Sequence, residues 1–227
     1  MAFTYADAQS LAQDLLDDYT NNMWDANTRL RFANRANQMV FEELFSACPD
    51  LFMSVSQITW PASTASVDLS GASYLNATVR ALKQILETPS AAAPSATNPG
   101  SPWTAASSYR ELVDRYEWNT VRYPSQPIYH LAGQTLHVAP PPTAARYLTV
   151  VWHSGPSALT STSSVVLNGA APSVADAVGY CMAYLMNAKQ NSQNPAVGEL
   201  WAQALQKIRA YRNTTGPSRI VATRRHG

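Results

Sequence analysis

The chain has 227 residues, a formal net charge of +1 and a charged-residue content of 14%, which is low against roughly a quarter in ordinary globular proteins. This balance excludes a protein that coats nucleic acid over its whole surface, although a local basic patch remains compatible with it. A chain of this length buries roughly 70% of its unfolded surface. We therefore expect one large or two small domains with a real core, and a weakly charged surface that suits a subunit of an assembly.

The cysteines and the start of the chain bear on the compartment. Cys48 and Cys181 lie in helical patterns without metal-ligand or redox spacing, so buried free thiols in a reducing compartment are expected. The first residues lack a basic segment followed by an apolar core, and no apolar run reaches the roughly 18 residues of a membrane span. We expect a protein that is made in the cytoplasm, with no membrane contact.

The first expected helix runs from Tyr5 to about Tyr19. Thr4 is placed to cap it, and Asp7 lies near its positive end. Its apolar periodicity predicts that Leu11 and Leu15 are buried.

The second expected helix covers residues 25–47, because Asp25 followed by Thr28 is a helix-start signal and Pro49 stops the pattern. Its apolar face comprises Leu30, Ala33, Met39, Val40 and Leu44. Three arginines near its start oppose the helix dipole by a few tenths of a kcal/mol each. Solvation, pairing with carboxylates, or contact with a neighbouring subunit are the alternatives for Arg29, Arg31 and Arg35.

After Pro49 the periodicity changes to that of strands. Residues 53–60 alternate and predict a strand, and residues 67–69 predict a short one. Residues 79–86 fit a third strand, although Leu82, Ile85 and Leu86 also fit a helix. Residues 88–106 form a low-complexity loop that is either the tip of an insertion or a solvated linker.

A short helix at residues 108–118 precedes the clearest β region. Residues 127–131 and 134–138 predict a hairpin with its turn at Ala132-Gly133, and residues 146–153 predict a further strand. In that last strand the alternation predicts that Leu148, Val150 and Trp152 lie on one face and the side chains between them on the other.

Two histidines in the predicted hairpin are candidates for metal ligands or for the centre of a hydrolase. A turn at Ala132-Gly133 puts His130 and His137 diagonally on one face. A third ligand would have to be His153 or a carboxylate, and no Asp or Glu occurs between Glu117 and Asp176. No Gly-x-Ser-x-Gly elbow or glycine-rich phosphate loop is present either. We therefore expect sheet histidines, no catalytic residues, no metal and no cofactor.

The last quarter of the chain holds two expected helices and a basic tail. Residues 172–189 are apolar on nearly all sides, so part of this helix is expected to stay uncovered by its own chain. Residues 195–213 carry a second stripe of Val197, Trp201, Ala204, Leu205, Ile208 and Tyr211. The tail, residues 214–227, has only basic charge, and we expect it to become ordered on a partner.

Three stretches, residues 29–37, residues 129–142 with 147–152, and residues 175–211, resemble the head-to-tail connector, or adaptor, proteins of tailed bacteriophages. The resemblance implies a ring, commonly of about twelve copies, that sits beneath the portal, joins the DNA-filled capsid to the tail and continues the DNA channel. It implies as partners the portal protein, a tail or nozzle protein, other copies of the chain, and passing double-stranded DNA without sequence-specific binding. The helical part would face the portal and the β part the tail.

The expected fold is α+β. Residues 1–49 and 172–213 would form a four-helix bundle, and residues 50–171 a β-rich, antiparallel, sandwich- or barrel-like domain inserted between the second and third helices. An extended arm, residues 214–227, would follow. The predicted portal- or subunit-binding residues are Trp201, Arg209, Tyr211, Arg212, Arg219, Ile220, Val221, Arg224 and Arg225.

The aromatic residues of the middle region support a second hypothesis. In a carbohydrate- or surface-binding virion module, they would stack on sugars. The aromatic residues concerned are Trp103, Tyr109, Tyr116, Trp118, Tyr123 and Tyr129.

Overall fold

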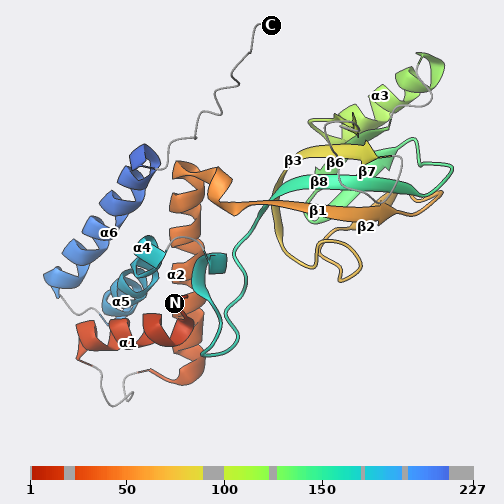
Figure 1. Ribbon diagram of the computed structural model, residues 1–227. Helices are drawn as coiled ribbons and strands as arrows, with labels where there is room; N and C mark the ends of the chain where they lie inside the picture. The colour runs from red at the N-terminus through yellow and green to blue at the C-terminus, as the bar shows by residue number, and fades with distance from the viewer. Residues whose placement is uncertain are drawn as a thin grey trace, which may run out of the picture. The chain divides into compact units, whose positions relative to one another are not determined.

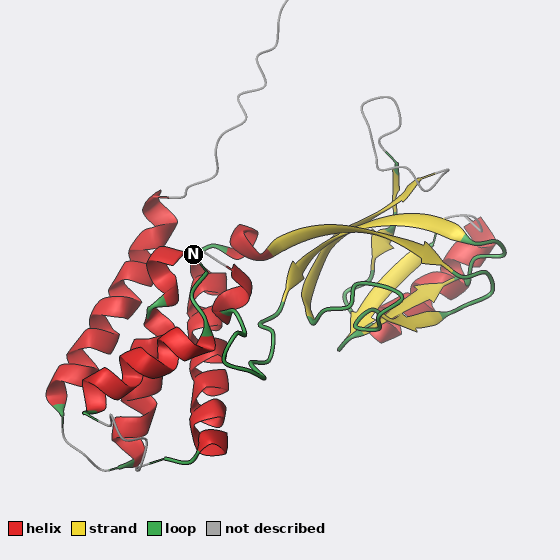
Figure 2. Ribbon diagram, turned by 60° about the horizontal axis from the view of Figure 1, so that its bottom comes forward, coloured by secondary structure: helices red, strands yellow, loops and turns green. Residues whose placement is uncertain are grey.

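The computed structural model describes residues 2–17, 24–88, 100–122, 127–169, 172–190 and 194–214. The chain forms two compact units, residues 1–51 with 156–227, and residues 52–155. Helices make up the first unit, and the strands and one helix make up the second (Figures 1 and 2). The predicted α+β class is confirmed, with antiparallel sheets, but these sheets do not close into a barrel.

Five helices belong to the first unit among its described residues. They are α1 (Tyr5–Leu16), α2 (Ala26–Ala47), α4 (Pro172–Ala175), α5 (Ala177–Lys189) and α6 (Pro195–Thr214). Short 3-10 turns follow α2 at Pro49–Phe52 and precede α4 at Val166–Gly169.

The starts of α1 and α2 follow from side-chain caps that the sequence predicts. The Thr4 hydroxyl accepts a hydrogen bond from the Asp7 amide, and the Asp7 carboxylate accepts one from the Thr4 amide at 2.8 Å. Asp25 accepts a bond from the Thr28 amide at 2.9 Å. Bonds to the Thr4 backbone and hydroxyl hold the pKa of Asp7 below its usual value, and bonds from the Thr28 hydroxyl and amide do the same for the pKa of Asp25.

The first helix is shorter than predicted and is buried along a different line. It ends at Leu16, because Asp17 adopts a left-handed conformation with φ of 55°. The buried residues are Tyr5, Ala8 and Ala12, whereas Leu11 and Leu15 are half-buried. Small alanines bring the backbone of α1 close to its neighbours, so the larger leucines lie at the edge of the contact.

The expected single helix at residues 172–189 is two helices, α4 and α5, interrupted at Asp176. The Asp176 carbonyl accepts bonds from both the Gly179 and the Tyr180 amides, at 2.9 and 3.2 Å, which tightens this turn.

The expectation that this helix leaves apolar surface uncovered is wrong for most of its length. The helix α5 contacts α1, α2 and α6 of its own chain. Its small residues Ala177, Gly179 and Ala183 are buried, as are Val178, Cys181, Met182 and Met186. These small side chains let α1, α2 and α6 approach α5 closely. Helices of the same chain therefore cover most of the apolar sides of α5. Burial raises the pKa of the Cys181 thiol to about 12.

Two asparagines of α2 hold the segment that returns from the second unit. The Asn34 amide exchanges bonds with both backbone groups of Leu159, at 2.8 and 3.0 Å. Asn37, which is 2% exposed, accepts a bond from the Leu167 amide at 2.9 Å and donates one to the Ser157 carbonyl at 3.2 Å. These hydrogen bonds provide partners for backbone amides and carbonyls of the returning segment that no helix or sheet pairs.

The second unit contains two four-stranded sheets. The first has the order β1 (Met53–Trp60), β8 (Arg146–Ser154), β3 (Val79–Thr88) and β4 (Ser101–Pro102), and all its pairs are antiparallel. The second has the order β2 (Ser66–Asp68), β7 (Thr135–Ala139), β6 (Ile128–Ala132) and β5 (Thr104–Ala105). Its β5–β6 pair is parallel. The helix α3 (Tyr109–Arg122) connects β5 to the segment before β6.

Both sheets contribute to one hydrophobic core, as the strand periodicity predicts. Leu148, Val150 and Trp152 of β8 lie on its buried face, and the segment that also fitted a helix is the strand β3. Trp60 is fully buried, donates to the Thr64 carbonyl at 2.9 Å and packs edge-on against Trp103. Of the predicted loop at residues 88–106, residues 89–99 lie outside the described part of the chain, and residues 100–106 include β4 and β5.

The hairpin turn lies one residue later than predicted. Ala132 pairs with Thr135, so the turn residues are Gly133 and Gln134. Gly133 has a φ of +62°, which glycine adopts without strain. The Gln134 side chain accepts from the Val79 amide at 2.7 Å and donates to the Val79 carbonyl at 3.0 Å. These hydrogen bonds to β3 thus determine the register of the β6–β7 hairpin, which the local sequence alone does not specify.

We expect Gln134→Ala to lower the free energy of unfolding by about 1–2 kcal/mol, because both half-buried backbone groups of Val79 lose their partner. Gln134→Glu is the matched variant, since it retains the acceptor for the Val79 amide but places a second carboxylate oxygen against the Val79 carbonyl. It should restore little of the stability that the alanine variant loses, because two acceptors then face each other. Urea unfolding followed by tryptophan fluorescence measures both, and equal stability of Gln134→Ala and the native chain would contradict the role given to this side chain.

Candidate interaction surfaces

The predicted contact residues at the end of the chain occupy different environments. Arg209 of α6 is at the surface, with its side chain 68% exposed and its guanidinium nitrogen 3.6 Å from a Glu43 carboxylate oxygen of α2. Trp201 is only 7% exposed and stacks on Tyr184 of α5, so it belongs to the core of the helical unit. The remaining predicted residues either lie in α6 without a described side chain or lie outside the described residues: Tyr211, Arg212, Arg219, Ile220, Val221, Arg224 and Arg225.

A cleft of about 630 Å³ lies beside the first half of α2. Three cations line it, Arg31 and Arg35 from α2 and Lys189 from the end of α5, together with Thr28, Leu30, Phe32 and Asn34. No carboxylate in the described part of the chain forms an ion pair with any of the three cations. The cleft therefore has the charge of an anion-binding surface. We name it the basic cleft.

Sequence reasoning found part of the basic cleft. It identified Arg31 and Arg35 as arginines that need either solvent or a partner, and the structure leaves both exposed. It did not connect them with Lys189, which is more than 150 residues later in the sequence and comes to the cleft only because α5 packs against α2.

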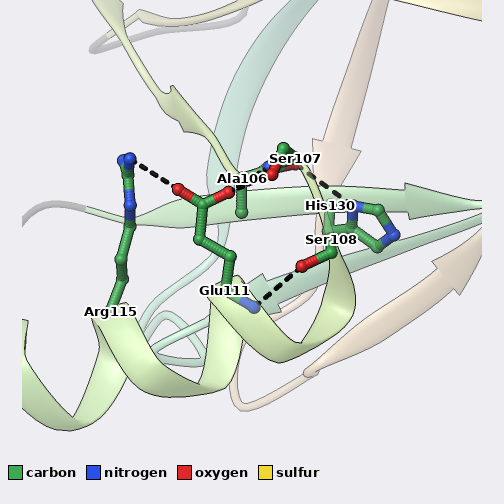
Figure 3. Close-up of polar contacts among 6 residues, drawn as sticks. All are labelled: Ala106, Ser107, Ser108, Glu111, Arg115 and His130. Atoms are coloured by element: carbon green, nitrogen blue, oxygen red, sulfur yellow. Dashed lines mark hydrogen bonds and ion pairs between the residues drawn. The ribbon is translucent and has the colours of Figure 1, made fainter.

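The two hairpin histidines lie directly opposite each other, not diagonally, because of the shifted turn. The His130 ring nitrogen Nδ1 is 3.1 Å from the Ala106 carbonyl oxygen (Figure 3). The His137 ring packs edge-on against Tyr109, with 5.0 Å between centroids. Among the described residues no group of three His, Cys, Asp or Glu side chains is placed to hold a metal ion. Both rings thus connect the hairpin to the segment around α3.

The polar network beside His130 caps α3. The Glu111 amide donates to the Ser108 hydroxyl at 3.1 Å, and the Glu111 carboxylate accepts from the Ser107 amide at 2.6 Å and pairs with Arg115 at 2.6 Å (Figure 3). Hydrogen bonds from the Ser107 hydroxyl and amide hold the pKa of Glu111 below its usual value. A carboxylate used in this way stabilises a helix N-terminus.

The aromatic residues do not gather into a stacking surface among the described side chains. Trp103 and Tyr129 are 5% and 6% exposed and belong to the β core, where burial raises the pKa of Tyr129. Tyr109 is exposed and contacts His137. The side chains of Tyr116, Trp118 and Tyr123 lie outside the described part of the structure.

A family model described as SU10 adaptor protein matches residues 3–225, nearly the whole chain. The chain belongs to the SU10 adaptor protein family. The resemblance to phage head-to-tail adaptors is thereby confirmed, and a member of this family is a component of the virion.

No curated protein matches this SU10 adaptor family member. In the described part of the chain, no helix is both long enough and apolar enough to cross a membrane.

Proposed function

We propose that this adaptor forms a ring of about twelve copies beneath the portal, joins the capsid to the tail and continues the DNA channel without turning over a substrate. The family match over residues 3–225 is the observation that carries the proposal. Its partners are the portal protein, a tail or nozzle protein, and double-stranded DNA that passes without sequence-specific contact. The place of action is the neck of the virion, after synthesis in the host cytoplasm.

The organisation of the chain into two units supports a different binding role for each unit. We infer that α1, α2, α5 and α6 act as a four-helix bundle that faces the portal, with the β-rich part inserted between the second helix and the third and facing the tail. The chain leaves the helical unit after Leu51 and returns to it at Pro156, which agrees with such an insertion. Domain boundaries at residues 1–49 with 172–213, 50–171 and 214–227 belong to this proposal.

The basic arm, residues 214–227, is proposed to bind the portal together with Arg209. The arm contains Arg219, Arg224 and Arg225 and no acidic residue, and Arg209 is exposed on the helix that leads to it. The buried Trp201 stabilises this helix by packing against Tyr184 in the core of the helical unit. An arm that becomes ordered on docking has a large contact area for its length.

Removal of residues 214–227 is expected to weaken binding to portal rings on the order of 100-fold, because a charged segment and its apolar pair Ile220-Val221 are lost together. Negative-stain electron microscopy of the adaptor with portal rings shows whether a collar is added, and titration gives the affinity. A variant with alanine at Arg219, Arg224 and Arg225 separates charge from the apolar contact, since it should bind weakly and lose its salt dependence.

Two outcomes would count against the proposal. An unchanged affinity of the truncated chain would remove the arm from the interface. A full-length chain that stays monomeric and ignores the portal would remove the adaptor function, and binding of glycans to the β unit would then be tested.

A further inference from the structure

We propose that the basic cleft is one half of the contact between neighbouring copies of this chain, and that its occupant is the acidic C-terminal end of α1 from the next copy. This inference rests on the proposed ring. A closed ring needs two different surfaces on each copy, because its contacts are heterologous. The helical unit has two such surfaces with opposite charge.

The first surface is the basic cleft itself. Arg31, Arg35 and Lys189 are exposed and have no acidic partner among the described residues. Three like charges around one concavity repel each other, so an anion that enters lowers their free energy. The cleft volume of about 630 Å³ is large enough to admit part of a protein segment.

The second surface is the end of α1. Residues 1–28 contain Asp7, Asp14, Asp17, Asp18 and Asp25 and no lysine or arginine. Asp7 and Asp25 already serve as caps of helices. Asp14 and Asp17 are exposed at the C-terminal end of α1, and no cation of the described residues pairs with them.

The position of these carboxylates makes an external partner favourable. A helix C-terminus carries partial negative charge, so Asp14 and Asp17 oppose the dipole of α1. A cationic partner relieves this repulsion. The basic cleft of another copy supplies two guanidinium groups, which bind carboxylates through paired hydrogen bonds.

Apolar groups on both sides favour a protein segment over the DNA backbone as the occupant. The basic cleft contains Phe32 and Leu30, and the end of α1 presents the half-buried Leu15 and Leu16 beside its carboxylates. A DNA backbone presents phosphates without apolar side chains. The mixture of cations and apolar groups therefore fits an acidic helix end better than a duplex.

Charge reversal tests the proposal with full-length chains. One variant carries Arg31→Glu and Arg35→Glu, and the other carries Asp14→Lys and Asp17→Lys. Each alone is expected to associate on the order of 100-fold more weakly than the native chain, because like charges meet at every contact. Mixing the two variants should restore association, since alternating copies place every acidic surface against a basic one. Sedimentation velocity measures this without the portal.

A chemical cross-link gives an independent readout. A carbodiimide joins an amine to a carboxylate in direct contact, so it should link Lys189 to Asp14 or Asp17. Mixing heavy-isotope and ordinary chains before cross-linking shows by mass spectrometry whether the link lies between two copies. Arg110→Glu with Lys207→Glu is the matched control for Arg31→Glu/Arg35→Glu, because it changes the net charge equally at exposed residues that do not line the basic cleft.

The outcomes separate this inference from the ring on the portal. A native chain that adds a collar to the portal, while the reversed variants assemble normally and no inter-copy link forms, overturns the inference and leaves the adaptor function intact. Restored association of the mixed variants with an inter-copy link supports the inference even if no collar forms. Loss of DNA binding in Arg31→Glu/Arg35→Glu with unchanged self-association would assign the basic cleft to phosphate and overturn the inference.

Discussion

Asn37→Leu is expected to lower the free energy of unfolding of the helical unit by about 2–4 kcal/mol. Leucine has the branching and the number of side-chain heavy atoms of asparagine, with bulkier methyl groups, so the loss comes from unpaired polar groups and tighter packing and not from a cavity. The Leu167 amide loses its acceptor at 2.9 Å and the Ser157 carbonyl loses a donor at 3.2 Å. Burying such groups without a partner costs about 1–3 kcal/mol each. Urea unfolding followed by circular dichroism at the helix band measures the loss.

The neighbouring residue supplies the control for this variant. Gln38 is exposed, and its side-chain amide donates a hydrogen bond to the Glu42 carboxylate in the next turn at 2.8 Å. Gln38→Leu should change the free energy of unfolding by less than about 0.5 kcal/mol. If both variants have the same small effect, Asn37 does not hold the returning segment in solution.

Gly179→Ala and Gly198→Ala are expected to change stability in opposite directions. A methyl group at Gly179 would lie 2.7 Å from Leu11 Cδ2 and 3.1 Å from its Cβ. The terminal methyl group of Leu11 is able to turn away, but its Cβ is fixed by α1, so the contact between α1 and α5 must open. Overpacking of this kind costs about 1–3 kcal/mol.

At Gly198 of α6 an added methyl group meets nothing within 4 Å. Alanine there should raise the free energy of unfolding by up to about 1 kcal/mol through helix propensity alone. Leu11→Ala combined with Gly179→Ala should cost less than the sum of the two single variants, because the contact with Leu11 Cδ2 at 2.7 Å is removed and only the contact with Cβ at 3.1 Å remains. Thermal unfolding of all four chains tests this, and stabilisation by Gly179→Ala would show that α1 adapts freely.

Local signals were sufficient wherever one short stretch decides the structure. Thr4 and Asp25 start their helices as predicted, because a cap involves only residues three apart. Leu148, Val150 and Trp152 of β8 are buried together as predicted, although Thr149 and His153 on the opposite face are buried as well. The whole-chain order of elements was also enough to indicate the family.

Features that depend on contacts between residues far apart in the chain could not be predicted from local sequence patterns. The turn at Gly133-Gln134 is selected by bonds to Val79, and the covering of α5 depends on how closely its small residues admit three helices. Trp201 has the pattern of an exposed aromatic anchor as much as that of a core residue, and only its stack on Tyr184 decides between them.

The α+β class, most helix starts and strands, and membership of a phage adaptor family follow from periodicity, caps and the order of elements along the chain. Which charges come together depends on how the helices pack. Arg31 and Lys189 are far apart in the chain and share a cleft only because α2 and α5 pack against each other. The residues of such a cleft come from separate elements and form no local sequence pattern. The cleft can therefore be identified only in the folded chain.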